Sequence, residues 1–455
     1  MVKKNYKGKK VSVIGYGRSG KACANLLLSM GAKIFVSDQA EHRNPKPDNR
    51  QEIDFEFGKH SERILNTDII IISPGVSLNQ PIILKAREKN IPVIGELEFA
   101  SRLIDNPMIG ITGTNGKTTT AFLIQKILES AGRKAVVCGN MGIPLSSVVE
   151  KLSPDTVVVI EVSTFQLETV ENFHPWIGIL LNITPDHMDR HSSFQEYKNL
   201  KLKLFSNQEK DDFAILNFDD SVVREANTRA KKLFFSCRSN LPIATLYSSC
   251  QSGTPAIYIK DGNIYWAQDK LFSIKKLNLK WECLLPDYLA SILVGKIFEL
   301  SHSLILKGLN SFTGVPHRLE EVGMVGKVRF INNSMCTNPE AFISTLYSFK
   351  SRRGGIILIA GGKEKKVDII PIAQAINKYT KYTVLIGETS EKLSKLLNVQ
   401  HNSAGTMEEA VNIAYARANS EDVVLLSPGF ASFDWFRDFS ERGEKFKEAV
   451  RKLKN

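Results

Sequence analysis

Residues 108–119 read Met-Ile-Gly-Ile-Thr-Gly-Thr-Asn-Gly-Lys-Thr-Thr, and this stretch decides the fold of the central part of the chain. An apolar run at 108–112 leads into a glycine-rich turn, and a helical pattern follows whose apolar positions are Phe122, Leu123, Ile127 and Leu128. A strand, such a turn and a helix in this order form a phosphate-binding loop, because backbone N–H groups and the helix N-terminus face the anion. The stretch therefore predicts an α/β nucleotide-binding domain.

The loop carries side chains that suit a nucleoside triphosphate. Lys117 would neutralise the outer phosphates, and the Thr118 hydroxyl could reach Mg²⁺. The strict motif has glycine where Ile111 stands, so the loop is a variant, and a chance glycine-rich turn is the alternative. The predicted ATP-binding residues of the loop are Gly113, Thr114, Asn115, Gly116, Lys117, Thr118 and Thr119.

Polar residues follow the neighbouring predicted strands. Glu161 comes after the apolar run 157–160, and the run 177–181 leads into Asn-Ile-Thr-Pro-Asp-His-Met-Asp-Arg-His at 182–191. Ligands of parallel sheets bind at the carboxyl ends of the strands. A lone loop histidine is more often solvated than ligating, but Glu161 beside the phosphate loop favours a metal site that includes His187.

A second glycine-rich turn, Gly15-Tyr16-Gly17-Arg18-Ser19-Gly20, follows the apolar run 11–14, and Asp38 ends the next predicted strand. A further strand candidate at 68–73 ends in Ser73-Pro74-Gly75. The pattern is typical of dinucleotide-binding folds. NAD, FAD and UDP-sugars all present a pyrophosphate to this backbone, so the turn alone predicts only a diphosphate ligand.

The 455 residues are too many for one core, and apolar runs alternate with helical patterns throughout. We expect three α/β domains: a Rossmann-like domain at 1–104, a phosphate-loop domain with a parallel sheet at 105–314, and a Rossmann-like domain at 315–455. The central domain should include a small β region at about 211–280. Strands of the last domain are expected at 355–359, 382–386 and 423–426.

Composition narrows the function. The net charge of +12 comes from basic residues interleaved with acids, which favours a solvated surface and anionic small substrates over nucleic acid. The six cysteines have neither paired spacing nor histidine partners, so neither zinc nor a disulfide framework is indicated. Without a long apolar run we expect no membrane insertion. The prediction is a cytoplasmic monomer with small-molecule partners.

Motifs along nearly the whole chain point in one direction. They are 15–20, 73–75, 113–118, Gly-Asn-Met-Gly at 139–142, Glu-Val-Ser-Thr-Phe-Gln-Leu-Glu at 161–168, Asp-His-Met-Asp-Arg at 186–190, Pro-His-Arg-Leu-Glu at 316–320, and the block from Leu426-Ser427-Pro428 to Gly443. Together they resemble the Mur ligases, and most closely the branch that adds D-glutamate.

The resemblance implies an ATP-dependent ligase of peptidoglycan precursor synthesis. Such an enzyme activates the carboxylate of UDP-N-acetylmuramoyl-L-alanine as an acyl phosphate and joins it to D-glutamate. It implies two Mg²⁺ ions as cofactors beside ATP, with Mn²⁺ as a substitute. Arg318 would reach the ATP phosphates from the third domain, so that domain closure completes the site and excludes water.

The resemblance also assigns residues. The catalytic set is Lys117, Glu161, His187, Lys201 and Arg318. The metal ligands are Thr118, Glu161, His187 and Lys201, whose position in Tyr197-Lys198-Asn199-Leu200-Lys201 implies a carbamylated lysine. The UDP-substrate would contact Gly15, Arg18, Ser19, Asp38, Gly75, Asn140, Ser163 and Gln166. D-Glutamate would contact Thr337, Lys365, Ser432, Phe433 and Phe439.

Two stretches depart from the family pattern. Cys-Leu-Leu-Pro-Asp at 283–287 stands where His-Asn-x-x-Asn is usual, and Asn-Asn-Ser-Met-Cys-Thr-Asn at 332–338 replaces Asn-Asp-Ser-Lys-Ala-Thr-Asn. Because the usual groups serve the nucleotide, we expect weaker or less selective nucleotide binding. Asp287 would accept a hydrogen bond from the adenine amino group, and Asn333 would replace the ribose-binding carboxylate. A harmless lineage difference is the alternative.

Three other functions compete with this prediction. A related ligase could add another amino acid or act on folate-like substrates, against which Lys365, Ser432 and Phe439 argue. A nucleotide-binding homologue with reduced catalysis is disfavoured by the intact Lys117 and Glu161. An NAD-dependent oxidoreductase would leave the loop at Lys117 unexplained.

Overall fold

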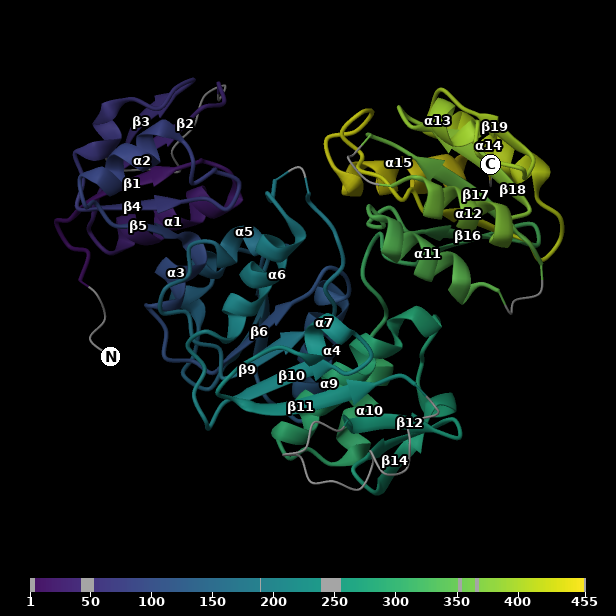
Figure 1. Cartoon of the computed structure of the whole chain (residues 1–455), viewed down its shortest axis with the longest axis horizontal. Helices are drawn as coiled ribbons and strands as arrows, with labels where there is room; N and C mark the ends of the chain where they lie inside the picture. Colours follow the sequence, from purple (N-terminus) through teal and green to yellow (C-terminus); the bar gives the residue numbers. More distant parts are fainter. Residues whose placement is uncertain are drawn as a thin grey trace. The chain divides into compact units, whose positions relative to one another are not determined.

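The computed structural model describes residues 5–41, 53–188, 190–238, 255–350, 354–364 and 368–453. Three sheets carry the fold (Figure 1). The chain divides into two compact units. The first comprises residues 1–183, 195–277 and 286–311, and the second comprises 184–194, 278–285 and 312–455.

The first sheet is parallel, in the order β3-β2-β1-β4-β5. Its strands are β1 (Lys10–Ile14), β2 (Lys33–Asp38), β3 (Ile53–Phe57), β4 (Ile69–Ile72) and β5 (Val93–Gly95). Successive side chains of these apolar strands point to opposite faces, and each face has its own core. The helices α1 (Arg18–Ser29) and α3 (Glu96–Ser101) cover one face, while η1 (Glu62–Leu65) and α2 (Pro81–Glu88) cover the other.

The second sheet has the order β14-β13-β12-β11-β10-β9-β6-β8-β7. Its strands are β6 (Met108–Thr112), β7 (Ala135–Gly139), β8 (Val157–Glu161), β9 (Ile177–Leu180), β10 (Phe213–Asn217), β11 (Lys231–Ser236), β12 (Pro255–Lys260), β13 (Asn263–Trp266) and β14 (Asp269–Ser273). The strands from β7 to β12 in this order are parallel, and β12, β13 and β14 form an antiparallel extension. The small β region expected at about 211–280 contains β10 to β14. β8 and β9 are buried along their whole length, as apolar strands covered on both faces must be.

Helices of the first unit pack around this sheet. They are α4 (Lys117–Ser130), α5 (Thr164–Leu167), α6 (Phe194–Leu202), α7 (Ser221–Arg224), α9 (Leu285–Ile297) and α10 (His302–Ser311). The α4 helix contacts β7 and β8 on one side and α10 on the other. Gly308 allows the close approach of α10, because a Cβ atom there would lie 2.5 Å from the Cα atom of Ile127.

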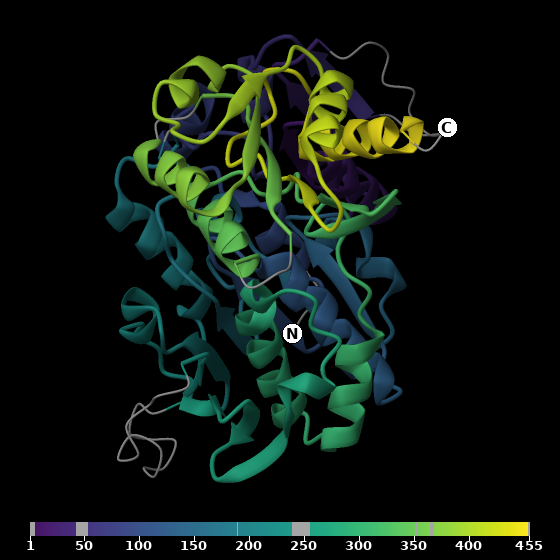
Figure 2. The same cartoon turned by 90° about the vertical axis from the view of Figure 1, so that its right-hand side faces the viewer.

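The third sheet lies in the second unit, in the order β15-β16-β20-β17-β18-β19. Its strands are β15 (Glu320–Val325), β16 (Val328–Asn332), β17 (Ile356–Gly361), β18 (Tyr382–Ile386), β19 (His401–Ser403) and β20 (Val423–Leu426), and only the pairing of β15 with β16 is antiparallel among these described strands. The helices α14 (Met407–Arg417) and α15 (Phe439–Lys452) close one core of this unit. The remaining helices are α11 (Pro339–Ser348), α12 (Ile370–Tyr379) and α13 (Ser390–Ser394), and α11 packs on α12 (Figure 2).

The predicted fold class is confirmed, and the ends of the predicted strands lie within two residues of the observed ones, with 108–112, 382–386 and 423–426 matching at both ends. The domain limits at 104 and 314 stay a prediction, and the second unit takes residues 184–194 and 278–285 from within the expected central domain. Cys23, Cys138, Cys237, Cys283 and Cys336 are free thiols, while Cys250 lies outside the described residues.

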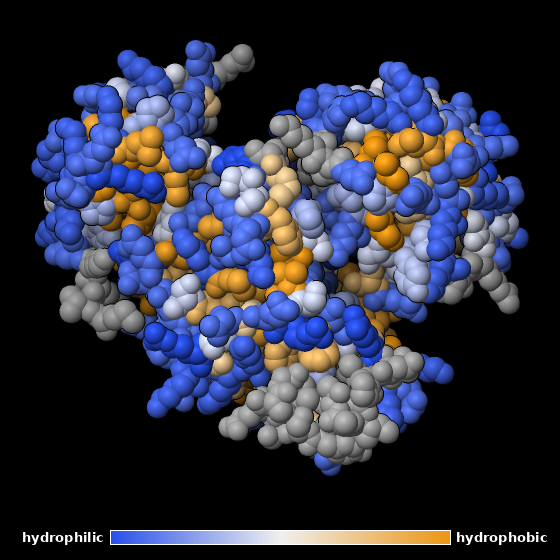
Figure 3. Space-filling model, viewed as in Figure 1, coloured by the Kyte–Doolittle hydropathy of each residue, from blue (hydrophilic) through white to orange (hydrophobic). Residues whose placement is uncertain are grey.

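Hydrophilic residues cover most of the face seen in Figure 3. Among the described residues, no helix combines the length and the apolar character that crossing a bilayer requires.

Candidate active site

The phosphate loop follows β6 and ends where α4 begins at Lys117. Gly116 has a φ of 92°, a left-handed conformation that favours glycine, and a Cβ atom there would lie 2.2 Å from Oδ1 of Asp287. The Lys117 ammonium donates to the carbonyl oxygens of Gly113 at 2.9 Å and Thr114 at 3.0 Å. Lys117 is therefore folded over its own loop, and it must turn outward to meet a phosphate.

Glu161 connects the phosphate loop with the neighbouring strand end. It ends β8, which lies between β6 and β7 in the sheet, and its side chain is 2% exposed. One carboxylate oxygen accepts a hydrogen bond from the Thr118 hydroxyl at 2.7 Å, and the other accepts one from the Asn140 amide at 3.0 Å. Carboxylate and hydroxyl oxygens are ligands that Mg²⁺ prefers, so this pair of groups fits the metal expected here.

Asn182, which the sequence did not single out, makes hydrogen bonds to the phosphate loop from just beyond the end of β9. Its amide donates to the carbonyl oxygen of Asn115 at 3.1 Å and accepts from the Asn115 N–H at 2.8 Å. Its own carbonyl oxygen accepts from the Thr114 N–H at 3.0 Å. The only signal in the sequence was its place directly after the strand expected at 177–181.

Lys201 is buried on α6, with its ammonium 4.5 Å from the centre of the Tyr197 ring. The Tyr197 hydroxyl lies 3.2 Å from the Thr114 hydroxyl, which places this part of α6 against the phosphate loop. A buried ammonium is costly, and a carbamate would change its charge to negative. The carbamylation of Lys201 stays a prediction.

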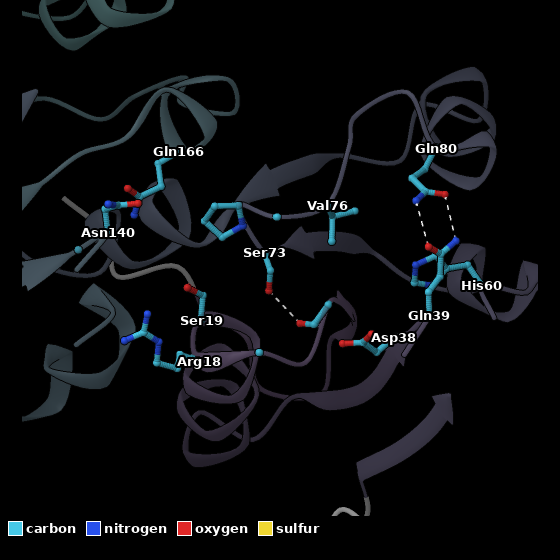
Figure 4. Close-up of a pocket in the computed structure, with 15 residues that line it drawn as sticks. Arg18, Ser19, Asp38, Gln39, His60, Ser73, Val76, Gln80, Asn140 and Gln166 are labelled. Carbon is cyan, nitrogen blue, oxygen red and sulfur yellow. Dashed lines mark hydrogen bonds between the residues drawn. The ribbon is translucent and has the colours of Figure 1, made fainter. Parts of the chain in front are cut away.

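A cavity of about 460 Å³ lies in the first unit beside the first glycine-rich turn (Figure 4). Seven of the eight residues predicted for the UDP-substrate line it: Gly15, Arg18, Ser19, Asp38, Gly75, Asn140 and Gln166. Ser163 is not among its lining residues. Instead it caps α5, where its hydroxyl donates to the Gln166 side chain at 3.1 Å and accepts from the Gln166 N–H.

The turn beside the cavity is held by its own residues. The Asp38 carboxylate accepts from the Tyr16 N–H at 2.5 Å, and the Ser73 hydroxyl donates to the Gly15 carbonyl oxygen at 2.8 Å. Gly20 allows α1 to begin close to the turn, because a Cβ atom there would lie 1.8 Å from the Gly15 oxygen. This packing is the reason that dinucleotide-binding folds place a glycine there.

Three polar residues that the sequence did not single out also line the cavity: Gln39, His60 and Gln80. The two glutamine amides exchange hydrogen bonds of 3.4 and 3.5 Å (Figure 4). Burial lowers the pKa of His60 despite the carboxylates of Asp38 and Glu56, so its imidazole is neutral at neutral pH. No motif marks these positions, because they lie in loops that only the sheet brings together.

The second unit holds the other predicted residues of the phosphate site. His187 has a positive φ of 56°, and its N–H donates to the Asp186 side chain at 2.9 Å. Arg318 donates its N–H to the Val315 carbonyl oxygen at 3.1 Å. Among the described residues, no group of three or more histidine, cysteine or acidic side chains is placed to hold a metal.

Asp287 and Asn333, which lie in the two stretches that depart from the family pattern, are both buried. Asp287 lies in the first turn of α9, beside Gly116 as described above. The Asn333 amide is engaged inside the second unit, because it accepts from the Leu319 N–H at 3.2 Å and donates to the hydroxyls of Thr345 at 3.1 Å and Ser427 at 3.2 Å. Asn333 would have to release these partners to contact a ribose, and both nucleotide contacts stay predictions.

The residues predicted for D-glutamate also lie in the second unit. Ser432 is buried, Thr337 and Phe439 are partly buried, and Phe433 is 70% exposed. Lys365 lies outside the described residues.

Comparison with known families gives the same answer for each part of the chain. Residues 9–95 match the Mur ligase MurD-like N-terminal domain, residues 111–264 the Mur ligase middle domain, and residues 317–430 the Mur ligase glutamate ligase domain. Among solved structures, a pseudomurein peptide ligase type C from Methanothermus fervidus shares the fold at a TM-score of 0.62 and 21% identity, over 98% of this chain and 100% of that one. UDP-N-acetylmuramate-alanine ligase MurC from Thermotoga maritima does so at 0.63 and 17%, over 98% and 99%.

Similar proteins at higher identity carry one name, UDP-N-acetylmuramoylalanine--D-glutamate ligase. The protein of that name from Thermoanaerobacter sp. (strain X514) is 40% identical, over 98% of this chain and 99% of its own length. Its namesake from Koribacter versatilis (strain Ellin345) is 39% identical, over 98% of each chain. The resemblance to the Mur ligases is thereby confirmed, and the chain belongs to the Mur ligase family, in the branch of the UDP-N-acetylmuramoylalanine--D-glutamate ligases.

Proposed function

We propose that the protein joins D-glutamate to UDP-N-acetylmuramoyl-L-alanine at the expense of ATP. The hydrogen-bond network around Glu161 carries this proposal. Asn140 lines the cavity and donates to Glu161, whose other carboxylate oxygen binds Thr118 of the phosphate loop. A nucleotide-linked substrate in the cavity and a triphosphate on the loop would thus have their reacting ends on either side of one carboxylate.

In the proposed reaction, the alanyl carboxylate attacks the γ-phosphorus of ATP and ADP leaves. Lys117 turns from the Gly113 and Thr114 carbonyl oxygens toward the phosphates and offsets the charge that develops on them. Mg²⁺, held by Thr118 and Glu161 with His187 and a carbamylated Lys201, would supply further charge neutralisation. A contact of Arg318 with the ATP phosphates is part of the proposal.

The amine of D-glutamate then attacks the acyl phosphate, and inorganic phosphate leaves. Basic and hydroxyl side chains suit the two carboxylates of this amino acid, and the predicted set comprises Thr337, Lys365, Ser432, Phe433 and Phe439. A monomeric, cytoplasmic enzyme that uses two Mg²⁺ ions, or Mn²⁺ in their place, completes the proposal.

The direct test is incubation with UDP-N-acetylmuramoyl-L-alanine, ATP, Mg²⁺ and one of D-glutamate, L-glutamate, L-alanine or D-lysine. Mass analysis should find the amide product and free phosphate with D-glutamate alone. Lys117→Ala should abolish turnover, whereas Lys126→Ala, on the same helix but paired with Glu129 on the surface, should retain it. A product with another amino acid, or none with any, would refute the proposal.

We further propose that the departures at 283–287 and 332–338 weaken the binding of ATP or its selection over GTP. The loss of one charged contact costs about 1.5 to 3 kcal/mol, which is roughly a hundredfold in affinity at most. Steady-state Michaelis constants for the two nucleotides measure the effect. A low constant for ATP together with a strong preference over GTP would contradict it.

A further inference from the structure

Arg442 is a buried cation in the second unit, where α15 begins. Its side chain is 0% exposed. Its Nε donates to the Ser334 hydroxyl at 3.0 Å, and its two terminal nitrogens donate to the carbonyl oxygens of Ser334 at 2.9 Å, Phe430 at 3.1 Å and Ala431 at 3.1 Å. These acceptors are all uncharged, and no ion pair of Arg442 is found among the described residues. Burying a charge without a paired carboxylate is costly, so its presence calls for a specific reason.

The groups that contact Arg442 belong to segments that carry the residues predicted for D-glutamate. Ser334 stands three residues before Thr337, and Phe430 and Ala431 directly precede Ser432 and Phe433. Phe439 begins the same helix, and its carbonyl oxygen accepts from the Ser334 hydroxyl at 2.7 Å.

The strand end that leads toward Lys365 also lies against this guanidinium. A Cβ atom at Gly362 would lie 3.1 Å from Nη1 of Arg442. The Ala431 carbonyl oxygen, which accepts from Arg442, also accepts from the Lys363 N–H at 2.9 Å. Arg442 thus lies where all the described segments of the predicted amino-acid site meet.

The charge of Arg442 persists at neutral pH. Burial lowers the pKa of its guanidinium to about 10, although the carboxylate of Asp434 acts in the opposite direction. A positive charge in a medium of low dielectric acts over longer distances than one in water. It would favour a substrate with two carboxylates nearby without having to touch it.

We propose that Arg442 is a positioning residue for the amino-acid substrate, which holds the segments at 334, 362 and 430–431 in register and supplies positive charge beneath the site. The proposal rests on the proposed function, because that function makes D-glutamate the substrate of these segments. In this proposal Arg442 contacts no substrate. It nevertheless affects the binding of D-glutamate and not that of the other two substrates, ATP and UDP-N-acetylmuramoyl-L-alanine.

Arg442→Lys is the informative change, because lysine keeps the charge but has three N–H donors in place of five. We expect the KM for D-glutamate to rise about tenfold or more, the loss of two hydrogen bonds being of that order. The KM values for ATP and UDP-N-acetylmuramoyl-L-alanine should change less than about threefold. Arg451→Lys, an exposed arginine in the last turn of the same helix, is the matched control and should leave all three values unchanged.

A second measurement separates the two halves of the reaction. Hydroxylamine traps an acyl phosphate as a hydroxamate without any amino acid, and the Arg442→Lys enzyme should form it at the wild-type rate. Ser334→Ala, a smaller change that removes one acceptor of Arg442 and the bond to Phe439, should raise the KM for D-glutamate in the same direction and keeps the test open if Arg442→Lys does not fold.

An unchanged KM for D-glutamate in both variants, or an equal rise for all three substrates, would overturn the inference and leave Arg442 a purely structural residue. The failure of the proposed function would look different. In that case the wild-type enzyme itself would form no hydroxamate from ATP and UDP-N-acetylmuramoyl-L-alanine.

Discussion

Asn182 lies two residues beyond the end of β9, outside the glycine-rich stretch, yet it makes hydrogen bonds to two residues of the phosphate loop. The bonds involve the backbone of Thr114 and Asn115, so they fix the direction in which the neighbouring N–H groups point. A phosphate cradle depends on this direction, because its donors are backbone groups that cannot adjust one at a time. The loop motif therefore defines only part of the cradle, and the next strand end supplies the rest.

Asn182→Ala removes the two side-chain bonds to Asn115 and leaves the backbone bond to Thr114. At about 1 kcal/mol for each bond, the KM for ATP should rise about tenfold or somewhat more, with little change for D-glutamate. Steady-state kinetics with each substrate varied in turn measure the effect. The control is Asn398→Ala, which changes an exposed amide of the second unit. If the Asn182→Ala enzyme had the same KM for ATP as this control, the hydrogen bonds of Asn182 would not be needed for ATP binding.

At the scale of an element, α3 carries two buried glutamates with opposite electrostatics. Burial alone would raise the pKa of Glu98, but N–H donors of Glu171, Asn172 and Phe173 and the guanidinium of Arg102 outweigh it, so that the pKa is lowered. Among the described residues, the carboxyl of Glu96 accepts only from the N–H and the hydroxyl of Ser146, and burial raises its pKa. The short helix thus binds loops of the second sheet through two carboxyl groups whose pKa values are shifted in opposite directions.

The two glutamates serve as controls for one another. Because the pKa of Glu98 is lowered in the folded state, its carboxylate stabilises the fold at neutral pH, and this stabilisation is lost as the pH falls through the folded-state pKa. Glu98→Gln should therefore lower the free energy of unfolding by about 1.5 to 3 kcal/mol at pH 7 and by less in acid. The raised pKa of Glu96 has the opposite effect. The stabilisation that this carboxyl group provides is complete below the pKa of about 4.3 in the unfolded chain and is lost as the pH rises through the folded-state pKa. Relative to wild type, Glu96→Gln should therefore gain stability with rising pH.

Thermal unfolding midpoints across the acid and neutral range, measured for wild type and both variants, give the comparison. If the stability differences of the two variants changed with pH in the same direction, the two pKa values would not be shifted in opposite directions.

For the whole molecule, the apolar runs were enough to predict the strands and the α/β class of the three sheets, because parallel strands covered on both faces must be apolar throughout. The meeting of Glu161 with the phosphate loop was predictable too, since the carboxyl ends of parallel strands share one edge.

Other features depend on packing that no local pattern encodes. The sequence of α15 is rich in acidic and basic residues, which is typical of a solvated helix, and its charge pattern does not show that Arg442 is buried and Arg451 exposed. His60, Gln39 and Gln80 meet in the cavity only because β1 lies between β2 and β4. The order of the strands and the burial of Arg442 rather than Arg451 depend on the packing of the whole chain.

The central claim is that a substrate carboxylate takes the γ-phosphoryl group of ATP before the amide forms. The enzyme is incubated with ATP, Mg²⁺, D-glutamate and UDP-N-acetylmuramoyl-L-alanine that carries oxygen-18 in its terminal carboxylate. Mass analysis of the released inorganic phosphate is then the most direct test. The released phosphate is expected to carry one labelled oxygen, because the bridging oxygen of the acyl phosphate leaves with phosphorus. Unlabelled phosphate, released together with amide product, would contradict it.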